Sequence, residues 1–485
     1  MADSYNLRPP GPFRQQNISI HNPYLHAVIQ LAPKAQLLEL ARTLDNEREA
    51  QGSRGPLHGI PILVKDNIAT HPNLGVASTT GGCYGLVGSR VSASAPAVDR
   101  LVKSGAIILG KANLSELGWF NGWSALGGQT QSPFVKGGVR PDDTFSGHSN
   151  PGGSSSGSAV SVAAGLATVS IGTETDGSLV FPGTRAGLYC IKPTVGIISQ
   201  HGVIPISKLS DSIGPLAKTP RDVAIMLDAM VEPTSTTIPK GGYVSQFSSD
   251  WEGVKVGAVE VQPWLLSSFV VKPVESATSQ EIEEIEQAYE TLKQKLGNSF
   301  HASIDLVSAK DVGEDADGVD HFGYLTYADF RPLLNEYLQG LEDSPIRPLK
   351  EMIEFNEAHA DLQLPPDHPQ QDRVVRAEAF QSDPAKYEQA LKYIRRMSRE
   401  EGIDKTLAQY DIDVIIGPAD SFLSTLASAA GYPLALLPLG QMKFNGRPCG
   451  LVVLTRAHGE DKLLRFRSAW EKTFPQRPIP DLSRL

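Results

Sequence analysis

The chain has 485 residues, of which 40% are hydrophobic and 20% are charged, and its formal net charge is −10. This ordinary globular composition allows a sizeable core, and the acidic balance argues against a nucleic-acid partner, because such proteins concentrate Lys and Arg. The three cysteines, Cys83, Cys190 and Cys449, include no closely spaced pair. They therefore predict neither a disulfide framework nor a metal site.

The two ends of the chain give expectations about location. The first ten residues are polar and rich in proline, which predicts no secretory signal. The longest weakly polar stretch, 159–171, is too short to span a bilayer, so we expect a soluble, cytoplasmic protein without a membrane span. The last residues, Ser483-Arg484-Leu485, are a conservative variant of the peroxisomal Ser-Lys-Leu ending. A eukaryotic source would make a peroxisomal location the alternative.

Strand-like runs alternate with amphipathic helical patterns along the chain, which predicts an α/β layered fold. An apolar run at 59–68 is interrupted by Lys65, and a helix at 95–104 precedes a buried strand at 106–109. Farther along, we expect strands at 254–259, 413–416, 435–438 and 451–454 and helices at 279–296 and 460–474.

The domain organisation follows from changes in composition. We expect one domain over residues 1–485, with a Pro-, Ser-, Thr- and Gly-rich surface connection at 233–250. Residues from about 310 to 385 are rich in Asp, Pro and His and have weaker periodicity. This stretch is therefore predicted to form a peripheral cap.

Lys65 is a candidate general base, because the apolar residues Ile62-Leu63-Val64 before it indicate burial. A free lysine has a pKa near ~10.4, and burial can lower that pKa until the amine is neutral near pH 7. On a strand, Lys65 shares a face with Leu63 and Asn67, while Asp66 points to the opposite face. The alternative is a lysine with a buried stem whose ammonium reaches water.

Two Gly-rich turns flank a helix of small side chains. The first, 152–157, contains Ser154, and the second, 172–178, ends at Ser178. Glycines let the backbone turn tightly, so successive N–H groups can point into one hollow beside the Ser178 hydroxyl. Amide hydrolysis needs such a hydroxyl, fixed donors for the oxyanion and a proton for the leaving nitrogen. Together with Lys65, these turns contain the residue types that a serine hydrolase without a catalytic histidine needs.

This combination resembles the amidase signature family. The resemblance extends from about Asn22 to Glu471 and includes three further motifs: Trp123-Ser-Ala-Leu-Gly-Gly-Gln129, Lys192-Pro-Thr-Val-Gly196 and Asp211-Ser-Ile-Gly-Pro215. It implies an α/β/α layered fold, with a mixed central sheet covered by helices on both faces. It also implies that the reaction needs no cofactor and no metal.

The same resemblance implies roles for individual residues. Ser178 aligns with the nucleophile, Ser154 with the cis-peptide serine that relays the proton, and Lys65 with the general base. The oxyanion hole would consist of the backbone amides of Thr175, Asp176, Gly177 and Ser178. The version of the turn in this chain, Glu174-Thr-Asp-Gly-Ser178, looks like that of peptide amidases and many small-amide hydrolases.

Three departures from the family pattern are visible in the sequence. Asp176-Gly177 stands where Gly-Gly is commoner, so the Asp176 carboxylate must point away from the oxyanion or be paired. Val180 replaces a frequent arginine, which argues against a role as the glutaminase component of the transamidosome. The Asn22-Pro-Tyr motif comes early, so we expect the usual amino-terminal helices to be shortened.

Other motifs compete with this interpretation. Residues 153–157 fit the nucleophile elbow of α/β-hydrolases, with Ser155 central and histidines following at His201, His301, His321 and His458. That motif needs a strand directly before it, whereas residues 146–151 indicate a loop. The α/β-hydrolase interpretation is therefore disfavoured.

Nucleotide and metal sites are disfavoured on similar grounds. Residues 105–111 nearly match a P-loop, but Ala112 replaces the hydroxyl residue and the segment has the pattern of an apolar strand. Residues 315–320 lack the full EF-hand pattern, and His359 and His368 lack the spacing of zinc ligands.

We therefore predict an amidase that cleaves a carboxamide C–N bond through an acyl-enzyme on Ser178. The alternatives are an acyltransferase with the same acyl-enzyme and a non-catalytic binding homologue. The expected partners are a small-molecule amide or peptide amide and, as an option, a second copy of the chain. Substrate contacts are expected from Trp123, Gly127, Gly128 and Gln129. The aromatic side chains of Trp119, Phe120 and Trp123 favour an apolar or aromatic acyl group, unless they are core residues.

Overall fold

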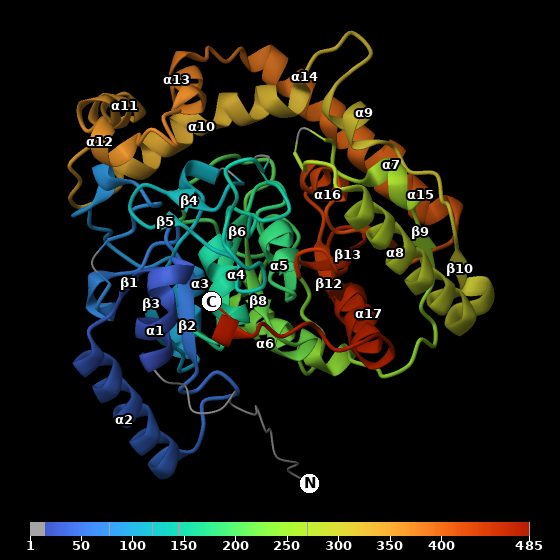
Figure 1. Ribbon diagram of the computed structural model, residues 1–485, viewed down its shortest axis with the longest axis horizontal. Coiled ribbons are helices and arrows are strands. Elements are labelled where there is room, and N and C mark those ends of the chain that lie inside the picture. Colours follow the sequence, from blue (N-terminus) through green and yellow to red (C-terminus); the bar gives the residue numbers. More distant parts are fainter. Residues whose placement is uncertain (1–14, 77, 119, 144–145, 269, 485) are drawn as a thin grey trace.

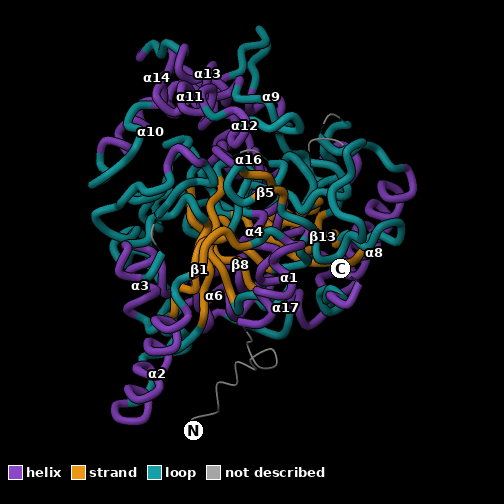
Figure 2. Tube along the Cα trace, turned by 60° about the vertical axis from the view of Figure 1, so that its left-hand side comes forward, coloured by secondary structure: helices purple, strands orange, loops and turns teal. Residues whose placement is uncertain are grey.

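The computed structural model describes residues 15–76, 78–118, 120–143, 146–268 and 270–484. Over these residues, eleven strands form one mixed sheet in the order β1-β3-β2-β6-β8-β7-β12-β13-β11-β9-β10 (Figures 1 and 2). The strands are β1 (Val28–Leu31), β2 (Pro61–Lys65), β3 (Ile107–Ala112), β6 (Val169–Glu174), β7 (Tyr189–Lys192), β8 (Ser212–Ala217), β9 (Val256–Ala258), β10 (Phe300–His301), β11 (Val414–Pro418), β12 (Leu434–Gln441) and β13 (Pro448–Leu454). A separate hairpin joins β4 (Trp123–Ser124) to β5 (Gly128–Gln129).

The direction of the central strands brings together two segments that contain candidate site residues. β2 pairs in parallel with both β3 and β6, with Ile62 opposite Val169 and Val64 opposite Ile171. Parallel neighbours end at the same edge of a sheet. Lys65, the last residue of β2, therefore lies beside the end of β6, where the turn that contains Ser178 begins.

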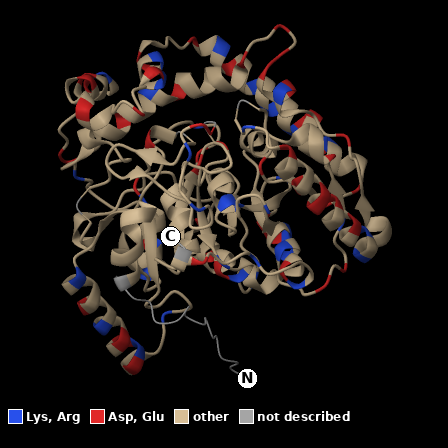
Figure 3. Ribbon diagram, in the orientation of Figure 1, with Lys and Arg blue, Asp and Glu red and all other residues tan. Residues whose placement is uncertain are grey.

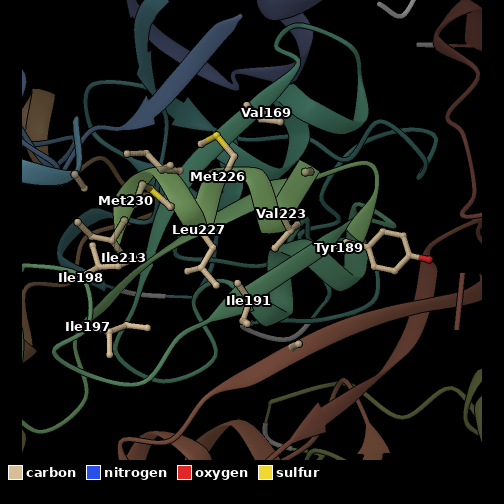
Figure 4. Close-up of a cluster of buried hydrophobic side chains, with 14 of the residues drawn as sticks. Val169, Tyr189, Ile191, Ile197, Ile198, Ile213, Val223, Met226, Leu227 and Met230 are labelled. Carbon is tan, nitrogen blue, oxygen red and sulfur yellow. The ribbon is translucent and has the colours of Figure 1, made fainter. Parts of the chain in front are cut away.

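Helices cover both faces of the sheet, as the sequence predicts. One face is covered by α3 (Pro96–Lys103), α6 (Pro220–Met230), α8 (Glu275–Leu296) and α17 (Glu460–Thr473). Figure 4 shows Val223 and Leu227 of α6 on the side of the helix that faces Ile191, and Met226 on the side of Val169. Residues at every third or fourth position of α6 share one face, which explains this packing.

The opposite face is covered by α4 (Ser156–Ala163), α5 (Val180–Arg185) and α16 (Leu423–Ala430). Every residue of α4 is buried. A Cβ built on Gly157 of this helix would lie 2.3 Å from the Ala27 carbonyl oxygen and 2.5 Å from the Asn113 nitrogen. Glycine at this position thus allows α4 to approach the neighbouring backbone closely. Toward the sheet edge, α1 (Gln15–Leu25) and α2 (Lys34–Gln51) pack against β1 and β3.

Beyond one end of the sheet lies a group of helices from residues 309–395 (Figures 1 and 2). The segment 310–385, which we call the cap, contains most of them. Their bounds are α9 (Ala309–Gly313), α10 (His321–Gln339), α11 (Leu349–Ala358), α12 (Ala360–Gln363), α13 (Asp372–Ala379) and, after the cap, α14 (Pro384–Arg395). The remaining α-helices of the described residues are α7 (Val261–Trp264) and α15 (Asp404–Gln409).

Three further features of the fold are the distribution of charged residues, the state of the cysteines and the character of the helices. Charged residues gather on outer helices such as α2 and α8 in Figure 3. Cys83, Cys190 and Cys449 are all buried and free. Within the described ranges, no helix combines the length and the apolar character that crossing a membrane would require.

Candidate active site

Lys65 ends β2 with its side chain on the face that α4 covers. Ile62 and Val64 pack in the cluster beneath α6, whereas Leu63 packs on the other side with Val160 of α4. Since side chains alternate along a strand, Lys65 shares the face of Leu63. Its Nζ lies 2.7 Å from Ser154 Oγ and 2.8 Å from Thr173 Oγ1, and it donates to the Thr173 carbonyl at 3.2 Å.

Burial changes the proton affinity of this lysine. Only 1% of Lys65 is exposed. Loss of water around the amine lowers the pKa of Lys65 to about 7, although the carboxylates of Glu174 and Asp211 act in the opposite direction. Lys65 is therefore not a lysine whose ammonium reaches water. A neutral amine is available near pH 7, as a general base requires.

The Asp66 carboxylate does not offset the lowering of the Lys65 pKa, because its side chain points to the other face of the sheet. Its Oδ2 accepts hydrogen bonds from the Thr80 hydroxyl and the Gly82 backbone nitrogen, and its Oδ1 lies 3.9 Å from Lys111 Nζ. The prediction that Asp66 and Lys65 face apart is confirmed. Asn67 lies on the Lys65 side and donates to Thr173 Oγ1 at 3.0 Å.

Ser154 lies in the turn that leads into α4. The peptide bond between Gly153 and Ser154 is cis, and the Ser154 carbonyl accepts a hydrogen bond from the Ser115 nitrogen at 2.9 Å. Ser154 is 3% exposed, and the distance of 2.7 Å from its hydroxyl to Lys65 Nζ is that of a hydrogen bond. The turn therefore places a hydroxyl directly against the buried amine.

Ser178 closes the turn after β6, which we call the Ser178 turn (Thr175–Ser178). Gly177 has φ +74°, a left-handed conformation that suits glycine. Ser178 is 4% exposed, and its carbonyl accepts a hydrogen bond from the Ser155 nitrogen at 3.1 Å. This bond joins the Ser178 turn to the residue that follows Ser154. The Glu174 carboxylate accepts from the backbone nitrogens of Leu179 and Val180 at 2.7 and 3.1 Å, which fixes the start of α5.

The side chain of Asp176 is paired. Its Oδ2 accepts a hydrogen bond from the Thr425 hydroxyl of α16 at 2.8 Å. Burial raises the pKa of Asp176 to about 6, although the hydrogen bond from Thr425 acts in the opposite direction. The carboxylate is thus bound to α16 through Thr425.

A pocket of about 650 Å³ lies between the core and the cap. Trp123, Gln129 and Asn150 line it from the core, and His368 and Gln363 line it from the cap. The Trp123 and His368 rings stack with centroids 4.2 Å apart. Asn150 connects the pocket to the Ser154 turn, because its Oδ1 accepts from the Gly152 nitrogen at 2.7 Å.

The other predicted substrate residues occupy different places. Gly127 ends the β4–β5 turn and Gly128 begins β5; they pack against Asn113 and His26, respectively, outside the set of described residues that line the pocket. Phe120 packs edge to face on Phe181 at 5.9 Å, in a core cluster. Trp119 lies outside the described residues.

The residues of the competing hydrolase, P-loop and metal-site motifs lie in environments that do not fit those motifs. Ser155 is fully buried and donates to the Thr173 carbonyl at 3.0 Å, and a loop precedes it. His321 contacts Asp315 at 2.9 Å and His458 contacts Thr236 at 3.0 Å, so neither is held by Ser155. The P-loop-like segment is strand β3. Among the described residues, no group of three or more His, Cys, Asp or Glu could hold a metal ion.

Comparison with known sequences agrees with this architecture. The family model described as amidase matches residues 14–421. A relative named "Probable amidase" from Arabidopsis thaliana is 36% identical over 487 residues, which cover 96% of this chain and 86% of the relative. Because the match extends over most of both chains, it includes the core strands, the two Gly-rich turns and the cap.

Solved structures show the same fold. Peptide amidase from Stenotrophomonas maltophilia superposes with a TM-score of 0.81 at 33% identity, over 96% of this chain and 93% of that one. An amidase family protein from Bacillus anthracis superposes with a TM-score of 0.80 at 26% identity, over 96% of this chain and 87% of that one. The chain belongs to the amidase family, as its motifs predicted, and the layered fold with a mixed sheet is confirmed. This membership supports amide hydrolysis as the general class of reaction.

Several residues of the site were not singled out from the sequence. Thr173 contacts Lys65, Thr425 holds Asp176, and Gln363 and His368 bring the cap to the pocket. Thr173 could have been found from its place in the Gly-rich turn motif. Thr425, Gln363 and His368 lie in segments whose local sequence gives no sign of a role at the site, so only the folded structure reveals them.

Proposed function

We propose that this protein hydrolyses carboxamides through an acyl-enzyme on Ser178, with Ser154 and Lys65 as its proton relay. The observation that carries the proposal is the 2.7 Å contact between Lys65 Nζ and Ser154 Oγ, made by a lysine whose pKa is lowered to about 7 by burial. A neutral amine in contact with a hydroxyl can take up a proton without histidine.

The first step forms a tetrahedral intermediate on Ser178. Ser178 Oγ attacks the carbonyl carbon, its proton passes to Ser154 Oγ, and the Ser154 proton passes to Lys65 Nζ. The negative charge that develops on the carbonyl oxygen is stabilised by backbone N–H groups of the Ser178 turn. Glu174, Thr425 and the left-handed Gly177 hold this turn in place, so the donors need no rearrangement.

The next steps form the acyl-enzyme by release of the amine and then hydrolyse it. The proton on Lys65 returns through Ser154 to the leaving nitrogen, the C–N bond breaks and the amine departs. Water then attacks the acyl carbon and gives up its proton along the same relay. Ser178 regains its proton as the carboxylic acid leaves. Each proton taken up by Lys65 is returned along the proposed relay, so the enzyme returns to its starting state.

The pocket suggests a substrate class within this reaction, and we propose a polar, peptide-like amide. Many of the residues that line the pocket carry side-chain carboxamides: Asn121, Gln129, Gln131, Asn150, Asn356, Gln363, Gln370 and Gln371. A carboxamide can both donate and accept, so it matches peptide N–H and C=O groups. The name of the structural neighbour, peptide amidase, points in the same direction. Trp123 supplies one aromatic surface for a substrate side chain.

Covalent labelling tests the proposed nucleophile. A fluorophosphonate probe is expected to modify the wild-type protein at Ser178, as peptide mass spectrometry after digestion would show. Ser178→Ala is expected to abolish labelling, and Ser155→Ala, which changes a buried serine beside the relay, serves as the matched control. An adduct on Ser155 or on Ser154 would contradict the assignment.

A substrate panel tests the proposed class. Primary amides with the same leaving ammonia would be compared, one an N-acetylated dipeptide amide and the other a long-chain fatty amide. We expect a higher kcat/KM for the peptide amide, because its backbone groups pair with the carboxamides that line the pocket. A preference for the fatty amide would contradict the peptide-like class while leaving amide hydrolysis intact.

A further inference from the structure

The loop at 206–211 lies between the cap and the Ser178 turn and is hydrogen-bonded to both. On one side, the Thr175 hydroxyl donates to Asp211 Oδ1 at 2.7 Å. Asp211 Oδ2 accepts from the backbone nitrogens of Ile206 and Ser207 at 2.7 and 3.0 Å. Asp211 directly precedes β8, whose first residue, Ser212, pairs with Glu174 at the end of β6. The Thr175 contact therefore lies at the base of the Ser178 turn.

On the other side, the loop is held by Asp329 of α10. Its Oδ2 accepts hydrogen bonds from the Lys208 nitrogen at 2.8 Å and from the Ser207 hydroxyl at 3.1 Å. Its Oδ1 accepts from the Tyr387 hydroxyl of α14 at 2.9 Å. Asp329 is 3% exposed, so each bond replaces a lost water contact.

A second connection from α14 supports the same loop. Arg395 donates to the Leu209 carbonyl at 3.0 Å and to the Ala429 carbonyl at 2.7 Å. Ala429 lies in α16, the helix whose Thr425 holds Asp176. The side chains of Thr175 and Asp176 anchor the Ser178 turn. Thr175 is bonded to the loop at 206–211 and Asp176 to α16, and Arg395 of α14 donates a hydrogen bond to each of these two segments.

We propose that Asp329 is a positioning residue for the Ser178 turn and acts through Ser207, Asp211 and Thr175. The inference rests on the proposed function, because it assigns the backbone N–H groups of this turn to the oxyanion. Those donors stabilise charge only when they are aimed at the position of the oxyanion, so a small displacement costs rate and not ground-state binding. A buried carboxylate bonded to both the loop and α14 can transmit such a displacement.

Asp329→Ala is the test, with Asp329→Asn as the conservative variant. Asn keeps an oxygen for Ser207 and Lys208 and a polar group for Tyr387. We expect Asp329→Ala to lower kcat toward amides by about 2- to 30-fold with KM unchanged, the range typical of residues that act through others. Asp329→Asn should restore most of the rate. Asp320→Ala is the matched control, since Asp320 caps the same helix by accepting from the Gly323 nitrogen and does not contact the loop.

Inhibitor affinities separate positioning from loss of folded enzyme. A peptide aldehyde forms a tetrahedral adduct with an oxyanion, whereas the corresponding peptide alcohol only occupies the pocket. We expect Asp329→Ala to weaken binding of the aldehyde by the same factor as kcat and to leave binding of the alcohol unchanged. Equal weakening of both, or the same losses in Asp320→Ala, would overturn the inference.

A double-mutant cycle tests the route. Thr175→Val removes the hydroxyl that contacts Asp211, so Asp329→Ala should add little further loss in that background, and additive losses would overturn the route. Hydrogen exchange of the peptides that contain the Ser178 turn gives a readout without substrate. Asp329→Ala should increase exchange there and Asp320→Ala should not, and equal exchange would overturn the inference. If the wild-type protein did not cleave amides, the proposed function would fail while this exchange result still decided the inference.

Discussion

The two sides of the pocket are built differently. The core side belongs to the unit that carries Lys65, Ser154 and Ser178, which do not themselves line the pocket. These residues stand at the ends of parallel strands and at the start of α4, a helix with every residue buried. On the cap side, α13 buries only Val374 and Ala377 among its residues. The core residues that would act on the amide are thus fixed by main-chain pairing and dense packing.

The cap approaches the pocket through a few side-chain contacts. Gln363 donates to Glu116 Oε1 and accepts from the Tyr84 nitrogen at 3.0 Å, and His368 stacks on Trp123. Such contacts can change without disturbing the sheet. The comparison teaches that one wall of the pocket belongs to a densely packed core, whereas the other belongs to a cap that reaches the pocket through individual side-chain contacts.

The sharpest test of this division is Lys65→Ala. We expect kcat toward an amide to fall by about 10²–10⁴-fold, because a positioned base contributes that much. The loss should be smaller for an activated ester, whose better leaving group needs less help from the proton relay. Steady-state kinetics on both substrates would show the difference. Equal losses accompanied by a lower Tm would instead indicate a structural lysine.

The pH dependence of the wild-type enzyme follows from the same residue. Burial lowers the pKa of Lys65 to about 7, so the neutral base is abundant above that pH and is lost below it. We expect kcat/KM for amides to fall about tenfold per pH unit below pH 7 and to level off above it. A pH profile recorded with a neutral substrate would measure this. A rate that stays flat from about pH 5 to about pH 9 would contradict a titrating lysine.

A pair of glycine substitutions compares packing in the two regions. In the core, Gly157→Ala would place its Cβ 2.3 Å from the Ala27 carbonyl oxygen, so we expect a loss of about 1–3 kcal/mol in the free energy of unfolding. In the cap, a Cβ on Gly313 of α9 would meet only Phe322 Cβ at 3.9 Å. Gly313→Ala should therefore be tolerated. Denaturant unfolding of both variants would compare them, and similar losses would show that the cap is packed as tightly as the core.

The smallest effect is expected at the aromatic stack. His368→Ala removes one ring of the pair that lines the pocket, and such pairs contribute about 0.5–1.5 kcal/mol. We expect KM for a peptide amide to rise by about 2- to 10-fold with kcat unchanged, which is that free energy expressed as a ratio. Initial-rate measurements over a range of substrate concentrations would separate the two constants. A fall in kcat alone would place His368 closer to the reacting atoms than its position in the cap suggests.

Local patterns predicted much of the sheet and its helices. The apolar run before Lys65 is strand β2, the helix predicted at 279–296 is α8 with an earlier start at Glu275, and β11 and β13 lie at the expected strands. Those elements carry one apolar face each, and that is the signal a sequence displays. The alternation around Lys65 was enough to separate it from Asp66.

The cap helices and long-range anchors could not be predicted in this way. The buried face of α10 includes Asp329 and His321 beside Leu325 and Leu334, so its hydrophobic periodicity is interrupted. Those polar residues are buried because they bond to partners on other segments. The Thr425–Asp176 bond joins residues 249 positions apart. Nothing in either local sequence indicates such a partner, because it exists only once the chain has folded.

The burial of all three cysteines makes the protein suitable for site-directed spectroscopy. Cys83, Cys190 and Cys449 are buried, and loss of water around them raises the pKa of each thiol. A maleimide reacts with the thiolate, so these native positions should remain unmodified in the folded protein. A single cysteine introduced on the exposed surface of α13 and another on α2 would then accept fluorophores selectively. The distance between cap and sheet could be followed during turnover without first removing any native cysteine.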